Sequence, residues 1–200
     1  MQKKRMKTHL YFIILIVFIS CGQKIKTEKQ TEIMTESSYP EKFDAKNLTE
    51  ADKQILTDFK KRRNIFDKYL KENNMDLNSC PGCGYPTLSE RGGYEICEVC
   101  NWEDDNQDDQ NANEIWSGPN SNLSLTENRL KIGRTLNYLA DSLNGKINQN
   151  PKRFFEIYEK HRIRMNSIDE NKLMNADIND PIWTEYKEKG KVILTDLVAE

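Results

Sequence analysis

The chain has 200 residues, which is enough for one domain or two small ones. Hydrophobic residues make up 36% of it and the mean hydropathy is −0.82, so any hydrophobic core is small. Residues 1–20 contain four Lys/Arg and no acid, and without them 26 basic and 32 acidic side chains remain, a net charge of −6. This balance does not favour nucleic-acid binding.

The first residues predict an export signal. Four basic residues between positions 3 and 7 precede an unbroken apolar run at residues 10–19. The run is too short to span a bilayer core of ~30 Å, but it has the length of the hydrophobic region of a signal peptide. We therefore predict a signal peptide at residues 1–20, with an uncleaved signal anchor as the alternative.

The segment Phe18-Ile19-Ser20-Cys21-Gly22 resembles the lipobox of bacterial lipoproteins. The resemblance implies cleavage before Cys21, diacylglycerol on its sulfur and attachment of the protein to the lipid bilayer of the bacterial cell envelope. Each buried acyl CH₂ group contributes ~0.8 kcal/mol to such attachment. Residues 21–47 are polar and show no periodicity, so we expect a flexible tether with a mean reach of ~25–30 Å.

Residues 48–76 are expected to hold one helix. Thr49 and Asp52 have the spacing of an N-terminal capping box, and apolar residues recur at helical spacing as far as Leu70. We predict that this helix spans about 50 to 73. The basic run Lys60-Lys61-Arg62-Arg63 is interpreted as a solvated helix face.

Four of the five cysteines form two Cys-x-x-Cys pairs within residues 77–120. Two cysteines three positions apart can direct both sulfurs at one ion if the chain turns tightly between them, and four thiolates suit tetrahedral Zn²⁺. Gly84 and Asn101 follow the two pairs, and both residue types tolerate a positive φ. The predicted ligands of a structural Zn²⁺ are Cys80, Cys83, Cys97 and Cys100.

The residues between the two pairs predict a hairpin. Residues 85–91 and 94–98 have the pattern of two short strands around Gly92-Gly93, which would place the second pair opposite the first, as in a zinc ribbon. Two alternatives stay open for these cysteines, namely two disulfides in an exported protein or a redox-active pair. Gly84 and Pro86 disfavour the helix that normally follows a redox pair.

Three motifs in this segment carry a family resemblance. They are Cys-Pro-Gly-Cys-Gly-Tyr-Pro-Thr-Leu at 80–88, Tyr-Glu-Ile-Cys-Glu-Val-Cys at 94–100 and Trp-Glu-Asp-Asp at 102–105. Because it contains these motifs, the segment of residues 79–130 resembles the bacterial cysteine-rich CPCC domain. The chain departs from it at Gly82, where the family name implies a third cysteine, and at Glu98, where proline is common. The resemblance implies no enzymatic activity.

An acidic segment follows the second pair. No Lys or Arg occurs between Arg91 and Arg129, so we expect a solvated loop whose acidic face is presented to a basic protein partner. An alternative is a second, oxygen-ligated ion such as Ca²⁺ or Mg²⁺, although an EF-hand template fails at its glycine and at its last glutamate. The residues of this candidate partner or second-metal face are Glu103, Asp104, Asp105, Asp108 and Asp109.

Residues 121–200 predict a helical region. Trp102 and Trp116, which flank the acidic loop, are expected in the core. Four helices are predicted. The first runs from a capping box at 124–127 to about 145, and the second begins at Pro151. The third is short and is capped by Ser167 and Glu170, and the fourth runs from Pro181 to Gly190.

The sequence offers few groups for catalysis. Only one histidine, His161, follows residue 20, and we interpret it as a surface residue. A glycine-rich phosphate loop is lacking. A zinc ion held by four cysteines has no open coordination position, so the predicted ion is structural and the protein is not expected to be an enzyme.

These observations predict an α+β protein in which a zinc-ribbon-like module, residues 77–120, lies between an N-terminal helix and a C-terminal helical region. We expect a membrane-anchored zinc-binding lipoprotein with a non-catalytic role in binding a protein partner. One form of that role is protection of the producing cell against a basic toxin. The alternatives are a divalent-metal enzyme built on the five carboxylates, or a periplasmic thiol or disulfide protein.

Overall fold

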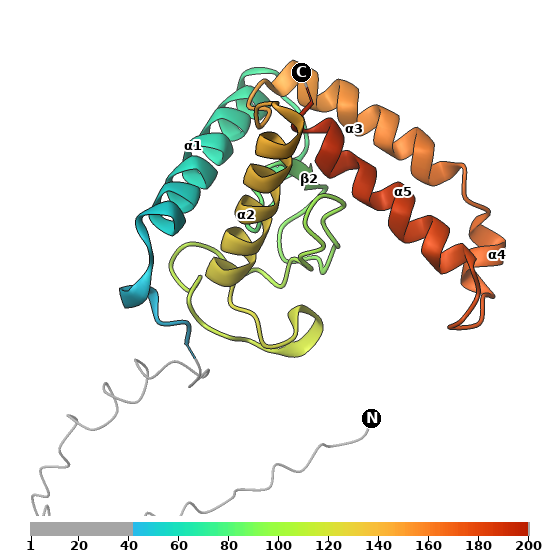
Figure 1. Ribbon diagram of the computed structural model, residues 1–200, viewed down its shortest axis with the longest axis horizontal. Helices are drawn as coiled ribbons and strands as arrows, with labels where there is room; N and C mark the ends of the chain where they lie inside the picture. Colours follow the sequence, from blue (N-terminus) through green and yellow to red (C-terminus); the bar gives the residue numbers. More distant parts are fainter. Residues whose placement is uncertain (1–41, 200) are drawn as a thin grey trace, which may run out of the picture. The chain divides into compact units, whose positions relative to one another are not determined.

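The computed structural model describes residues 42–199 (Figure 1). The predicted signal peptide, the predicted lipidation site at Cys21 and the predicted tether up to residue 41 lie outside the described residues. Residues 42–47 do not behave as the expected tether. The Phe43 amide donates a 2.7 Å hydrogen bond to the Asn113 carbonyl, Lys42 forms a 3.5 Å ion pair with Glu114, and a short 3-10 helix, η1, spans Ala45–Asn47.

Helix α1 spans Glu50–Glu72, which confirms the helix expected at about 50 to 73. The predicted capping box is present, because the Asp52 amide donates to the Thr49 hydroxyl at 3.1 Å and the Thr49 amide donates to the Asp52 carboxylate at 3.3 Å. The buried face of α1 includes Ile55, Phe59, Phe66 and Leu70. Their spacing of four or seven residues places them on one side of the helix.

A two-stranded antiparallel hairpin follows α1. Strand β1, Asn78–Ser79, pairs with β2, Pro86–Leu88, so the hairpin encloses the first cysteine pair. Strand β2 lies within the first of the two expected strands, at 85–91, but no strand is assigned at 94–98, so the expected pairing of these two segments is wrong. Gly92 has a positive φ, at 71°, as the first central residue of a two-residue hairpin turn does, but the chain on either side of it does not pair as two strands.

The segment between the two cysteine pairs binds to the acidic loop instead of forming the expected hairpin. The Gly92 amide donates a 2.7 Å hydrogen bond to the Asp104 carboxylate. The Tyr94 amide donates to the Asp104 carbonyl at 3.1 Å, and an isolated bridge joins Ile96 to Glu103. The second cysteine pair thus lies in a turn of its own.

Helix α2, Leu125–Leu143, begins at the predicted capping box of Ser124 and Glu127. Asn144, whose φ of 51° is left-handed, caps its C-terminus, close to the expected end at about 145. Helix α2 lies beside α1 in Figure 1. Gly133 permits the close approach of these helices, because a Cβ atom at this position would collide with the Ile55 side chain.

The remaining helices are α3, Pro151–Asn166, α4, Glu170–Met174, and α5, Ile182–Asp196. Two predicted boundaries are wrong. The cap of α4 is Asp169, whose carboxylate accepts a hydrogen bond from the Lys172 amide, rather than Ser167. Helix α5 continues through Gly190, because the next turns bury Ile193 and Leu197 in the core.

Aromatic side chains connect α1, the β1–β2 hairpin and α3 in the core. The Phe154 ring lies 5.2 Å from Phe66 and 5.1 Å from Tyr85, measured between ring centroids. The Tyr85 hydroxyl also donates a 2.9 Å hydrogen bond to the Asn148 carbonyl. The helices before and after the cysteine segment therefore pack together, as expected. No helix within residues 42–199 combines the length and apolarity needed to cross a bilayer.

Candidate metal centre

Two similar turns hold the two cysteine pairs. In the first knuckle, residues 80–85, the Gly84 amide donates to the Cys80 carbonyl at 2.8 Å. In the second knuckle, residues 97–102, the Asn101 amide donates to the Cys97 carbonyl at the same distance. Gly84 has φ 78° and Asn101 has φ 57°, so both positive φ values inferred from the residue types are confirmed.

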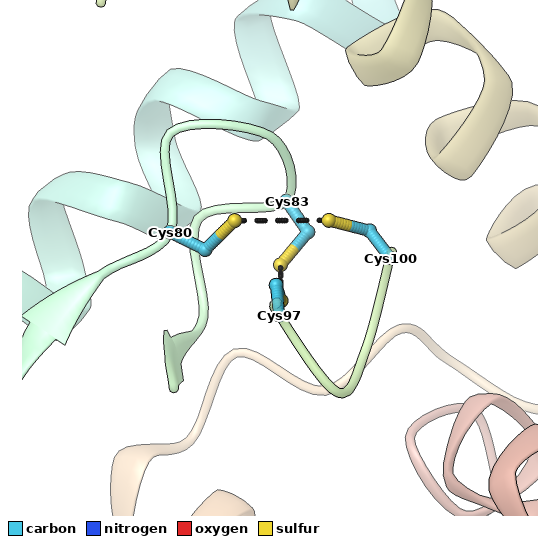
Figure 2. Close-up of side chains that lie close together, drawn as sticks. All are labelled: Cys80, Cys83, Cys97 and Cys100. Atoms are coloured by element: carbon cyan, nitrogen blue, oxygen red, sulfur yellow. Dashed lines mark hydrogen bonds between the residues drawn. The ribbon is translucent and has the colours of Figure 1, made fainter. Parts of the chain in front are cut away.

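The four sulfur atoms form one cluster (Figure 2). All four lie within 4.8 Å of one another, with Sγ–Sγ distances of 3.7 Å between Cys80 and Cys100 and 3.6 Å between Cys83 and Cys97. A tetrahedral ion with four ~2.3 Å bonds to sulfur would place the sulfurs about 3.8 Å apart. The cluster therefore has the size of a tetrathiolate metal site.

The cluster is enclosed by protein. Cys80, Cys83 and Cys97 are fully buried, and Cys100 is partly exposed. The 3.7 Å and 3.6 Å sulfur–sulfur contacts both run between the knuckles, so an ion at the centre would join one knuckle to the other. Within residues 42–199, these cysteines are the only group of three or more His, Cys, Asp or Glu residues with the geometry to hold a metal.

Hydrogen-bond donors surround the sulfurs. The Gly82 amide lies 3.3 Å from Cys80 Sγ, and the Thr87 hydroxyl lies 3.0 Å from Cys97 Sγ. The Asn128 side-chain amide approaches Cys100 Sγ at 3.7 Å. Such donors orient ligands and stabilise thiolates in metal sites.

Gly82 occupies a position with no room for a side chain. A Cβ atom there would lie 2.5 Å from Asn128 Nδ2, 3.1 Å from Cys100 Sγ and 3.1 Å from Trp102 Cβ. The Asn128 amide thus fills the space next to the position where the family name implies a third cysteine. This departure from the family pattern leaves the four clustered cysteines intact.

The protein surroundings act unequally on the four thiols. Burial raises the pKa of the Cys80 and Cys83 thiols well above the usual range. Burial also opposes ionisation of Cys97, but hydrogen bonds, the foremost from Cys100, outweigh it and hold the pKa of Cys97 well below the usual range. The metal-free cluster therefore favours a thiolate at Cys97, and binding of an ion to all four sulfurs would displace protons.

Two buried arginines contact the first knuckle. The Arg62 Nε donates a 2.8 Å hydrogen bond to the Cys83 carbonyl, and its guanidinium lies 5.0 Å from the centre of the Tyr85 ring. The Arg129 Nε donates a 2.8 Å hydrogen bond to the Pro81 carbonyl. The interpretation of residues 60–63 as a solvated face is therefore wrong for Arg62. Its only sequence signal is a basic residue at a core-facing helical position.

Arginines also neutralise the acidic segment. Asp104 is fully buried and accepts a 2.9 Å hydrogen bond from Arg91 Nε. Asp108 accepts hydrogen bonds from Arg63, at 2.5 and 2.7 Å, and from Arg91 at 2.8 Å. Partial burial raises the pKa of Asp108, but these hydrogen bonds outweigh it and hold that pKa well below its usual range.

The candidate acidic face is therefore not an open surface. Asp109 is the exposed member and lies 2.8 Å from Arg129, while Glu103 and Asp105 are half-buried. The backbone of residue 103 is held by the Asn120 side chain, whose amide also reaches Asp105 at 3.3 Å. The five carboxylates do not converge as ligands of a second ion, because arginines from other parts of the chain lie between them.

Two further residues differ in their placement. His161 is buried rather than on the surface, with its Nε2 3.4 Å from the Glu98 carboxylate and its ring stacked on Tyr158. Trp102 is buried in the core, as expected, whereas Trp116 is only half-buried, and its indole N–H donates to Glu114 at 3.0 Å. Helix α3 therefore contacts the second knuckle through a histidine that the sequence interpretation had placed in solvent.

Comparisons with known proteins agree with the local resemblance. The Cysteine-rich CPCC family model matches residues 78–135. This segment contains both knuckles, the acidic segment and the first half of α2. No curated protein and no solved structure matches the chain.

Proposed function

We propose that the protein binds one structural Zn²⁺. The proposal starts from the segment that matches the Cysteine-rich CPCC family and from the single cluster that its four sulfurs form. The ion would be held by Cys80, Cys83, Cys97 and Cys100. The spacing of the sulfurs carries this proposal, because two pairs between the knuckles, at 3.6 and 3.7 Å, fit the edges of a tetrahedral zinc–sulfur site and all four sulfurs lie within 4.8 Å of one another. When bound, the ion joins the knuckles, and its four protein ligands leave no position for a substrate.

Zinc binding would contribute directly to folding. The hairpin has strands of only two and three residues, and the second knuckle is a turn with one isolated bridge. A module with so little regular structure is only weakly stable by itself. Structural zinc contributes an apparent ~10–16 kcal/mol in comparable peptides, which is enough to decide whether such a module folds.

Metal analysis of the purified chain tests this proposal. Protein prepared without chelator should contain one zinc per chain, and native mass spectrometry should show the four ligand cysteines reduced. Cys83→Ser should lose the zinc, whereas Cys21→Ser is the matched control and should retain it. A metal-free chain with two disulfides among the four cysteines would contradict the proposal.

We also propose that Cys21 anchors the protein to the bacterial cell envelope. The support is the lipobox-like segment at residues 18–22 behind a basic and apolar leader. Expressed in bacteria, the wild-type chain should fractionate with membranes and be released by detergent. Cys21→Ala should remain unprocessed, and a membrane-bound, cleaved Cys21→Ala chain would contradict lipidation at this residue.

The third part of the proposal is a non-catalytic role in binding a protein partner. A closed tetrathiolate site supports a structural use of the metal, which leaves surfaces rather than a reaction centre to carry function. Beside the second knuckle, Tyr94 and Ile96 are exposed apolar side chains, 66% and 60% accessible. The basic character expected of the partner stays a prediction, and it has less support because arginines pair with Asp104, Asp108 and Asp109.

A photocrosslinking residue in place of Ile96, in bacteria that express the lipidated chain, tests the partner-binding role. One discrete crosslinked species should form, and the same residue in place of the exposed Tyr138 on α2 serves as the control. Crosslinking that is equal and diffuse from both positions would contradict a specific partner at the second knuckle.

A further inference from the structure

Among the described residues, Arg62 is a buried cation without a carboxylate partner. The residue is 3% exposed, and its contacts are the Cys83 carbonyl and the Tyr85 ring. Within residues 42–199, no ion pair joins Arg62 to an acidic side chain, whereas the adjacent Arg63 pairs with Asp108 at 2.5 Å. The missing counter-charge is unusual, because a buried charge is costly unless it is paired.

A carbonyl and an aromatic ring provide only partial negative charge. The group beside Arg62 that can carry full negative charge is the cysteine cluster, since the carbonyl that Arg62 contacts belongs to the ligand Cys83. Arg129 approaches the same knuckle through Pro81 and is 4% exposed. Its carboxylate partner Asp109 has a side chain that is 57% exposed, so solvent screens that pair.

A metal-bound cluster would carry negative charge. Four thiolates and one divalent ion have a net charge of −2, and Arg62 is a guanidinium at the first knuckle with no carboxylate partner within residues 42–199. We propose that Arg62, and to a lesser degree Arg129, are the counter-charges of a metal-bound tetrathiolate. This inference rests on the proposed zinc site and assigns both arginines as positioning residues of that site.

Four thiolates around a divalent ion have a net charge of −2, so metal binding supplies negative charge next to the knuckle that Arg62 contacts. We expect Arg62→Gln, which removes the charge but retains a hydrogen-bond donor, to weaken zinc binding about 10- to 100-fold. Arg62→Lys, which retains the charge, should weaken it less. A purely structural role in holding the Cys83 carbonyl would instead make the two variants similar.

A measurement on the iron-substituted full chain separates charge from structure. One-electron reduction of Fe³⁺ to Fe²⁺ at an electrode changes the charge of a tetrathiolate site from −1 to −2. A positive charge nearby favours the reduced form, so Arg62→Gln should lower the reduction potential. If Arg62 favours the reduced form tenfold, the shift is about 59 mV. Arg62→Lys should change the potential little.

Arg134→Gln is the matched control, because Arg134 lies on α2 with an exposed side chain and pairs with Asp52 at 2.6 Å. It should leave the potential unchanged. If Arg62→Gln fails to fold, Arg129→Gln tests the inference instead, and it should lower the reduction potential by a smaller amount. Equal potentials in the wild type and in every folded arginine variant would overturn the inference while leaving zinc binding intact. A wild-type chain that takes up neither zinc nor iron would contradict the proposed function itself.

Discussion

Side chains around the four cysteines set the charge and direction of the sulfur atoms. Thr87 provides the shortest donor contact to a sulfur, 3.0 Å from its hydroxyl to Cys97 Sγ. Cys97 is also the thiol whose pKa is held below the usual range by hydrogen bonds against the effect of burial. The threonine hydroxyl therefore stabilises the sulfur that ionises most readily in the cluster.

Thr87→Val should weaken zinc binding by about tenfold or more, because it removes the hydroxyl donor and nearly preserves the shape of the side chain. Chelator competition measures the zinc affinity. Thr87→Ser retains the hydroxyl and should bind zinc almost as tightly as the wild type. Equal affinities of the valine variant and the wild type would show that this hydrogen bond has no effect on the metal.

Gly82→Ala should destabilise the zinc-loaded protein by about 1–3 kcal/mol, as overpacking typically does. The added Cβ would meet Asn128, Cys100 and Trp102 at 2.5 to 3.1 Å. Denaturant unfolding measures the change in the free energy of unfolding. Asn128→Ala in the same chain removes the nearest obstacle, so the double variant should recover part of the loss, and no recovery would contradict the packing argument.

Local patterns determined which single residues could be predicted. The four cysteines, Gly84 and Asn101 could be predicted, because their roles depend on spacing and φ within a short turn. Arg62 and Arg129 could not, since their contacts with the first knuckle join residues 21 and 48 positions apart in the sequence. Asn128 approaches Cys100 across 28 positions and was missed for the same reason.

At the scale of elements, an aromatic cluster attaches α3 to the first knuckle and to α1. Phe154 is fully buried, and its ring lies 5.1 Å from Tyr85 of β1–β2 hairpin and 5.2 Å from Phe66 of α1. The helical region is therefore joined to the cysteine segment by packing as well as by the chain.

Phe154→Ala should lower the free energy of unfolding by about 3–5 kcal/mol, because it leaves a cavity between three elements. The purified variant should still contain zinc when folded, since all four cysteines of the cluster remain. Tyr138→Ala, at a residue 71% exposed on α2, is the control and should change stability by less than about 0.5 kcal/mol. A similar small effect at Phe154 would contradict the coupling of α3 to the knuckle.

The ion pairs between α1 and the acidic segment predict a dependence on pH. Asp108 has a pKa below its usual range, whereas an unfolded aspartate titrates near 3.9. The stabilisation is therefore complete above about pH 5 and is lost as the pH falls below about 4.

Asp108→Asn should lower the free energy of unfolding at pH 7 by about 2 kcal/mol, between the values for surface and buried ion pairs. The difference from the wild type should shrink in acid, where the wild-type carboxylate becomes protonated on unfolding. Unfolding measured for both proteins across this pH range checks the sign. Asp67→Asn is the control, because Asp67 is half exposed and its contact with Arg63 is 3.8 Å. A difference that grew in acid would contradict the assignment.

Helices were easier to predict than strands in this chain. Capping boxes at Thr49 and Ser124 have local signatures, and both helices begin where expected. The hairpin was misplaced because residues 89–93 bind the acidic segment through Arg91 and Gly92, a preference that their strand-like pattern does not encode. Likewise, Gly190 does not end α5, since the packing of Ile193 and Leu197 favours continuation of the helix.

At the scale of the molecule, folding brings basic side chains next to an acidic segment that has none in its own sequence. An acidic stretch without Lys or Arg was expected to project into solvent, but Arg63, Arg91 and Arg129 surround it. The buried Arg62 has no such acidic partner within residues 42–199, and it contacts the Cys83 carbonyl. Among the described residues, Arg62 is thus a buried positive charge without a carboxylate partner at the first knuckle.

X-ray absorption spectroscopy at the zinc edge tests the central claim most directly. The purified full chain should show four sulfur neighbours at about 2.3 Å and no nitrogen or oxygen neighbour in the first coordination shell. Zinc absent from the chain, or bound mainly to nitrogen and oxygen, would contradict a metal centre built from Cys80, Cys83, Cys97 and Cys100.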